Sequence, residues 1–145
     1  MQNFPHIYHA AATSTQTGAV RLRSDEGIDL IQSNAPKEFG GPGDQWSPET
    51  LLVAAVVDCF VLSFRAIARA SKLEWATLDC SASGTLDKVD GVTRFTAFTV
   101  TANLSVDGDV NEERALKILE KAEKYCLITN SMLATTHLQT IITRS

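Results

Sequence analysis

Basic charge is scarce in this chain of 145 residues, which contains 13 Lys and Arg against 17 Asp and Glu. The net charge of −4, without a basic stripe, argues against nucleic acid and anionic membranes as partners. Residues 1–5 lack the charged and apolar regions of a signal peptide. The longest apolar run, Leu51 to Leu62, is shorter than a bilayer span and contains Asp58, so we expect no membrane-spanning helix.

Cysteine occurs only three times, and an odd number disfavours the disulfide framework of small secreted proteins. We therefore expect a cytoplasmic protein in which a disulfide is catalytic rather than structural. The three histidines, His6, His9 and His137, show no metal-ligand spacing, so no metal and no cofactor is expected. With 44% hydrophobic and 21% charged residues, the composition is that of one globular domain over residues 1–145.

The apolar patterns and turn signals predict an α+β fold with mainly antiparallel sheets and two long helices. One helix begins at the N-cap Ser47, with Glu49 in its first turn, and runs to about Lys72. Another runs from Asn111 to near Cys126. The expected strands are 7–15, 19–23, 28–32, 77–86, 93–105 and 137–143, with hairpin turns at 24–27 and 87–91, a loop over 34–46 and a short turn or helix over 131–134.

The first half of the first helix, Leu51 to Leu62, is apolar on nearly every side. Such a pattern is typical of a helix that is buried all round. In so small a protein, a central helix of this kind would be covered in part by a second subunit.

Cys59, within that helix, and Cys126 are candidates for a two-cysteine redox site. A buried free cysteine is also a common small core residue, and for Cys59 the residues alone leave the two interpretations balanced. Cys80 alternates within a predicted strand and is interpreted as structural.

A reactive Cys59 needs a cation from elsewhere, because it lies about three turns into its helix and the helix dipole acts over about the first turn. Glu49 precedes it by ten residues, which is about 15 Å along a straight helix. If Glu49 belongs to the site, it acts across a subunit interface or the helix is broken between the two residues; complementing the helix dipole is the simpler role.

Three segments form a pattern: Asn34 to Gly41, Ser47 to Leu52, and Cys59-Phe60, ten residues after Glu49. They resemble the OsmC/Ohr family of osmotically inducible and organic hydroperoxide resistance proteins. The segment Cys126 to Ser131 is similar to the second cysteine element of that family. The resemblance extends over nearly the whole chain.

The resemblance implies an OsmC-like fold, an intertwined homodimer with the central helix buried between subunits, and thiol-dependent reduction of organic hydroperoxides. Cys59 would attack the O–O bond, and Cys126 would resolve the resulting sulfenic acid. Glu49 would orient an arginine that activates Cys59 and binds the peroxide. An external dithiol, lipoyl-type in some relatives, would complete the cycle.

The activating arginine is the main departure from the family pattern. In the hydroperoxide branch it comes from the N-terminal hairpin, at a position where this chain has none. The remaining candidates are Arg21, Arg23, Arg65 and Arg69. This departure favours a second interpretation, a non-catalytic or weakly active OsmC-like dimer that binds a small molecule. A structural domain with inert cysteines is a third.

Overall fold

A computed structural model describes residues 1–144 of the chain, which divides into two compact units, Met1–Leu51 and the residues from Leu52 onward. That the whole chain acts as a single domain stays a prediction.

The N-terminal unit is a small antiparallel sheet in which β2 (Val20–Arg23) lies between β1 (Ala11–Thr13) and β3 (Ile31–Ser33). The predicted hairpin around residues 24–27 is confirmed, although β1 and β3 are shorter than expected. The loop after β3 contains a short 3₁₀ helix, η1 (Lys37–Phe39). Among residues 1–51 only two are fully buried, and both are serines, so this unit has no apolar core of its own.

Helix α1 (Pro48–Ala70) begins where the sequence predicts. The hydroxyl of Ser47 accepts a hydrogen bond from the backbone N–H of Thr50 at 3.1 Å, and the hydroxyl of Thr50 accepts one from the N–H of Ser47 at 2.9 Å. Two N–H groups that the helix cannot satisfy internally are therefore paired by side chains.

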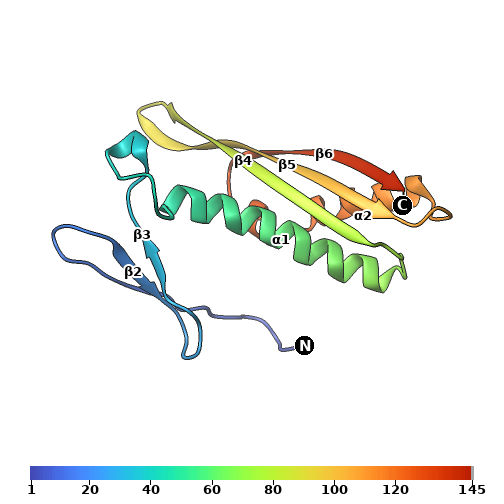
Figure 1. The fold of residues 1–145 in the computed structure, drawn as a ribbon, viewed down its shortest axis with the longest axis horizontal. Coiled ribbons are helices and arrows are strands. Elements are labelled where there is room, and N and C mark those ends of the chain that lie inside the picture. The colour runs from blue at the N-terminus through green and yellow to red at the C-terminus, as the bar shows by residue number, and fades with distance from the viewer. Residues whose placement is uncertain (145) are drawn as a thin grey trace. The chain divides into compact units, whose positions relative to one another are not determined.

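The C-terminal unit contains a second sheet, in the order β4 (Thr77–Val89), β5 (Val92–Val106) and β6 (Thr135–Arg144). Figure 1 shows the long β4–β5 hairpin beside β6. Asp90 and Gly91 form the hairpin turn, both with positive φ, as a type I′ turn requires. The hairpin and its Asp-Gly turn are thus confirmed.

Three of the four strand pairings are antiparallel, as expected, and the exception is β6, which runs parallel to β5 along its whole length. The connection passes through helix α2 (Glu112–Lys124) and a short helix α3 (Leu127–Asn130). A parallel pair needs such a crossover, since the chain must return to the end of the sheet from which β5 started. The α+β class holds, but this sheet is mixed.

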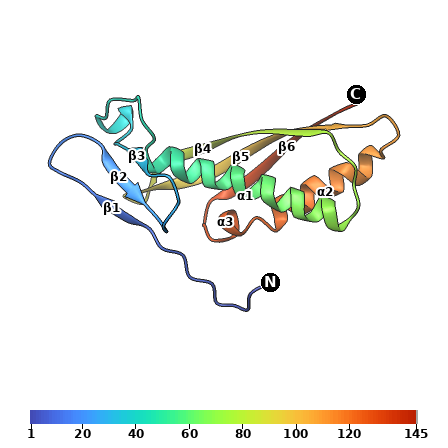
Figure 2. The ribbon, with the colours of Figure 1, turned by 60° about the horizontal axis from the view of Figure 1, so that its bottom comes forward.

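Two helices and one face of the second sheet enclose the core (Figure 2). Each element buries one stripe and leaves its outer side exposed; the outer sides of β4 and β6 carry mainly polar residues. The fully buried core residues are Val56, Phe60, Phe64 and Ala68 of α1, Ala115, Ile118, Leu119 and Ala122 of α2, Leu73, and Phe98, Val100, Ala102, Leu104 and Val106 of β5.

Helix α1 is not buried all round within the single chain. Its buried residues repeat every four positions, whereas Leu62, on another side, is 51% exposed. By length and apolar composition alone α1 would also qualify as a membrane-spanning helix, contrary to the expectation from the sequence. Only 22% of its most apolar window is buried in the single chain, and one such helix is weak evidence for a membrane span.

Candidate functional site

Cys59 lies in the middle of α1 and is partly exposed rather than buried. Its sulfur is 4.0 Å from the hydroxyl of Ser63, one turn further along the same helix. No Lys, Arg or His within the described residues makes a recorded contact with this sulfur. The side chain is therefore accessible to a small molecule.

Cys126 is buried, and it lies between α2 and α3 rather than at the end of the long helix. It is the N-cap of α3, where its carbonyl accepts hydrogen bonds from Asn130 and Thr129. Its Sγ is 4.0 Å from the carbonyl oxygen of Val56. The two cysteines are 67 positions apart in the sequence, and the fold places Cys126 in contact with α1, the helix that carries Cys59.

Val56 and Cys59 are neighbours on the surface of α1. Three residues correspond to a rise of about 4.5 Å and an angular offset of about 60° around the helix axis. Because the Cys126 sulfur contacts Val56, it faces the stretch of helix that carries Cys59. Both predicted thiols lie in the C-terminal unit, and Cys126 contacts α1 three residues before Cys59.

Cys80, on β4, is partly buried and serves as a contrast. Burial, with a smaller contribution from Asp79, raises the pKa of its thiol to about 11. A thiol with so high a pKa is almost wholly protonated at neutral pH and is a poor nucleophile. This agrees with its interpretation as structural.

The candidate arginines divide into two groups. In β2, Val20 and Leu22 line a cavity of the N-terminal unit, whereas Arg21 and Arg23 alternate with them and are exposed on the other face. Arg23 donates a hydrogen bond to the hydroxyl of Thr13. Neither arginine faces the cavity that contains Glu49.

Arg65 and Arg69 are exposed on α1, six and ten residues after Cys59. Those separations correspond to about 9 Å and 15 Å along the helix. They line a different cavity, at the end of α1, that does not include Cys59. Within the C-terminal unit, neither Arg65 nor Arg69 contacts Cys59.

Glu49 is placed in the first turn of α1, and its Oε2 is buried without a hydrogen-bond partner among the described residues. It belongs to a largely apolar cavity of about 500 Å³ within the N-terminal unit, together with Val20, Leu22, Phe39 and Leu51. The helix dipole favours a negative charge at this position. The structure thus leaves this carboxylate available for a cation that the described unit does not supply.

No group of three or more metal-ligating side chains that could hold a metal ion occurs among the described residues. The candidate groups of the C-terminal unit are the two thiols, which can exchange electrons with a substrate through sulfur chemistry, and that of the N-terminal unit is the carboxylate of Glu49.

The model of the OsmC-like protein family matches residues 41–140 of this chain. The match includes α1, both candidate thiols and both long strands of the β4–β5 hairpin. Because it covers more than half of the chain, this chain belongs to the OsmC-like family, and the resemblance noted from the sequence is confirmed.

The relatives found are similar in fold and distant in sequence. The uncharacterized protein YmaD of Bacillus subtilis is 27% identical over 118 residues, which is 79% of each chain. An OsmC-like protein of unknown function from Vibrio cholerae has a TM-score of 0.86 at 20% identity, over 94% of this chain and 100% of that one.

Two further structures carry functional names. The organic hydroperoxide resistance protein of Elizabethkingia anophelis has a TM-score of 0.78 at 20% identity, over 99% of this chain and 100% of that one. OhrB of Bacillus subtilis, also an organic hydroperoxide resistance protein, has a TM-score of 0.67 at 18% identity, over 94% of this chain and 98% of that one. Likeness at this level of identity shows the fold alone.

Proposed function

We propose that this protein is a thiol-dependent peroxidase that reduces organic hydroperoxides, with Cys59 as the peroxidatic thiol and Cys126 as the resolving thiol. The observation that carries the proposal is that the buried Cys126 sulfur lies 4.0 Å from the carbonyl oxygen of Val56. Val56 precedes Cys59 by three residues on α1. Membership of the OsmC-like family and the names of two structural neighbours support it.

The proposed cycle balances with one external reductant. The Cys59 thiolate attacks the O–O bond of the hydroperoxide; the alkoxide leaves, takes up a proton and becomes an alcohol, while Cys59 becomes a sulfenic acid. The Cys126 thiol then attacks that sulfur, forms a disulfide and releases water. A dithiol, which we propose to be lipoyl-type, reduces the disulfide and is itself oxidised. The reducing cytoplasm is the proposed location.

A homodimer is part of the same proposal. Two features support it: the exposed apolar side of α1 around Leu62, and the lack of an apolar core among residues 1–51. A second copy would cover apolar surface that a single chain leaves in water. It would also be a source of the cation that Glu49 and Cys59 lack within the described chain, so Glu49 would act by positioning that cation.

The test is hydroperoxide consumption with dihydrolipoamide as reductant. The Cys59→Ser variant should lose activity, whereas Cys80→Ser, the matched control, should retain it. Cys126→Ser should still react once and accumulate a sulfenic acid that dimedone labels at Cys59. Unchanged hydroperoxide consumption by Cys59→Ser would refute the peroxidase.

The cavity around Glu49 supports a second candidate function, binding of a small molecule without turnover. It is about 500 Å³, largely apolar, and contains one carboxylate oxygen without a partner. Cavities of this size with one polar anchor are typical of ligand sites. Full retention of three free thiols after hydroperoxide treatment would favour this function over the peroxidase.

A further inference from the structure

A second cavity, of about 560 Å³, lies at the C-terminal end of α1, apart from both candidate thiols. It is wholly within the C-terminal unit. Its lining residues are Arg65, Ala68, Arg69, Lys72, Leu73, Glu74 and Trp75. Three cations and one carboxylate therefore surround it, in a protein that is acidic overall.

The C-terminal end of α1 and the chain that follows it form this cavity. Leu73 N–H donates to the Ala68 carbonyl at 2.9 Å, and Lys72 N–H donates to the Arg69 carbonyl at 3.1 Å. Lys72 has a φ of 54°, so these bonds and the left-handed residue form a Schellman motif. The motif turns the chain back so that Trp75 lies beside the last turns of the helix.

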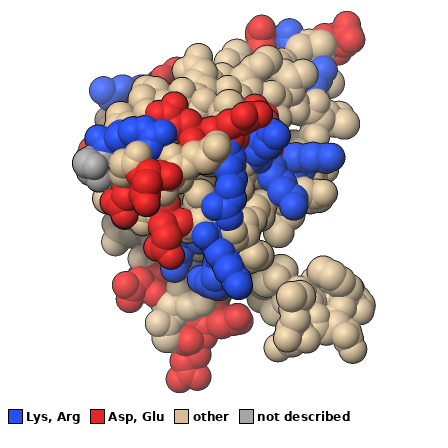
Figure 3. Space-filling view, turned by 90° about the vertical axis from the view of Figure 1, so that its right-hand side faces the viewer, with Lys and Arg blue, Asp and Glu red and all other residues tan. Residues whose placement is uncertain are grey.

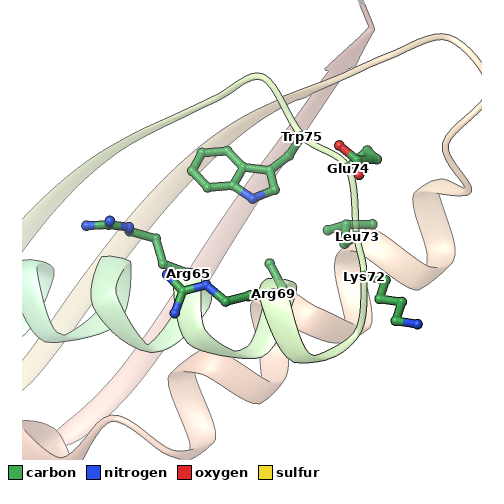
Figure 4. A pocket seen from close by; sticks show the side chains of 7 residues that line it. Arg65, Arg69, Lys72, Leu73, Glu74 and Trp75 are labelled. Atoms are coloured by element: carbon green, nitrogen blue, oxygen red, sulfur yellow. The ribbon is translucent and has the colours of Figure 1, made fainter.

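Figure 4 shows how the side chains are arranged around the cavity. Arg65 and Arg69 lie one turn apart and lean in the same direction, beneath the indole of Trp75. Lys72 extends away from them. Lys72 and Glu74 also line the cavity, but the two guanidinium groups are the cations drawn beneath the indole.

Neither guanidinium has a carboxylate partner among residues 1–144. The ion pairs recorded there join Lys117 to Glu113 and Arg144 to Glu112. Arg69 lies in the last turn of α1, where a cation complements the helix dipole. Arg65 is more than one turn from the helix end, so that explanation does not extend to it. In Figure 3, Lys and Arg side chains on this end of the molecule lie among Asp and Glu side chains.

The apolar part of the cavity is as well defined as its charge. Ala68 and Leu73 are buried beneath it. Trp75 is held by Phe64, with the two rings 5.3 Å apart at 75°. An indole fixed by the core offers one face to a flat ligand at little entropic cost. Guanidinium groups bind carboxylates through paired hydrogen bonds.

We propose that this cavity binds a small organic carboxylate that carries an aromatic ring. Arg65 and Arg69 hold the carboxylate, and the ring packs against Trp75 above Leu73. The volume is within the usual range for small-molecule sites. A bare inorganic anion would use the guanidinium groups but leave the exposed part of the indole uncovered.

The test is a titration of the whole 145-residue chain, in which ¹H–¹⁵N NMR spectra monitor the indole N–H signals. The protein has two tryptophans, so Trp46 serves as the internal control, and the Trp46→Phe variant assigns the two signals. Sodium benzoate is the probe, benzyl alcohol its neutral analogue and inorganic phosphate the bare anion. Benzoate should shift the Trp75 signal in a saturable way and leave the Trp46 signal in place.

Arg65→Gln and Arg69→Gln should each weaken benzoate binding about tenfold, since each removes a charge-assisted hydrogen bond. The matched control Arg23→Gln should bind as the wild type does. An unmoved Trp75 signal, equal affinity for benzyl alcohol or for phosphate, or wild-type affinity in both arginine variants would each overturn the proposal. The comparison of the three probes uses wild-type protein and does not depend on the folding of a variant. Cys59→Ser should bind benzoate normally, so this test is separate from that of the peroxidase.

Discussion

Oxidation by one equivalent of an organic hydroperoxide should raise the unfolding free energy of the reduced protein, because a Cys59–Cys126 disulfide would join two parts of the chain that are far apart in sequence. The cysteines are 67 positions apart. In the chain-entropy model, a crosslink over such a loop stabilises the folded state by about 4 kcal/mol. Strain from moving the buried Cys126 sulfur toward Cys59 offsets part of this, so we expect a gain of roughly 2–4 kcal/mol.

The measurement is urea unfolding, followed by circular dichroism, of reduced and oxidised protein at one protein concentration. The concentration is fixed because association of subunits also changes apparent stability. With an m-value of about 2 kcal/mol/M, the midpoint should rise by about 1–2 M. Intact-mass analysis with thiol counting should show a loss of two thiols, mapped to Cys59 and Cys126.

The Cys126→Ser variant is the control, since it can oxidise at Cys59 without closing the loop. Its midpoint should not rise on oxidation. If oxidised wild type unfolds at the same urea concentration as reduced protein, or if the disulfide maps to Cys80, the inferred proximity of the two thiols is wrong.

Three other predictions concern stability. Gly84→Ala should lower the unfolding free energy by roughly 1–3 kcal/mol in urea titrations, because an added Cβ would lie 2.9 Å from the rings of Phe95 and Phe98; an unchanged midpoint would show that the rings move freely. Lys72→Gly should raise the unfolding free energy by about 0.5–1 kcal/mol, and with it the melting temperature, since Lys72 occupies a left-handed conformation that glycine adopts without strain; a lower melting temperature would contradict this. Folding raises the pKa of Cys80 from 9.0 to about 11, so between those pH values the unfolded chain loses a proton that the folded protein keeps. Unfolding free energy should therefore fall as pH rises through this window, and less steeply in Cys80→Ala; identical slopes would refute the assignment.

Local chemistry made much of the fold predictable from the sequence. The Ser47 cap needs only residues three apart, and the Asp-Gly turn at 90–91 needs only two neighbours. The direction of β6 was not predictable in this way. Alternation in residues 137–143 identifies the face that is buried, but the same pattern suits a parallel or an antiparallel neighbour.

The candidate site was predictable in its residue types and less so in its geometry. Cys59 and Cys126 were recognised by motif, but only the fold places the Cys126 sulfur against Val56. The alternation along β2 shows that Arg21 and Arg23 face away from Val20 and Leu22. Only the structure shows that the face with Val20 and Leu22 lines the cavity. The cavity at the end of α1 had a signal, two arginines four residues apart before a tryptophan, that is also typical of a solvated helix face.

The parallel position of β6 has a consequence for synthesis of the protein. The β4–β5 hairpin is closed by a two-residue turn, and isolated hairpins form within about 10 μs. β6, by contrast, reaches its place beside β5 only after α2 and α3 have been made. A nascent chain on the ribosome therefore presents one edge of β5 unpaired until the crossover is complete. During that interval the edge is open to strands of other chains, and it is the segment where a chaperone would be most useful.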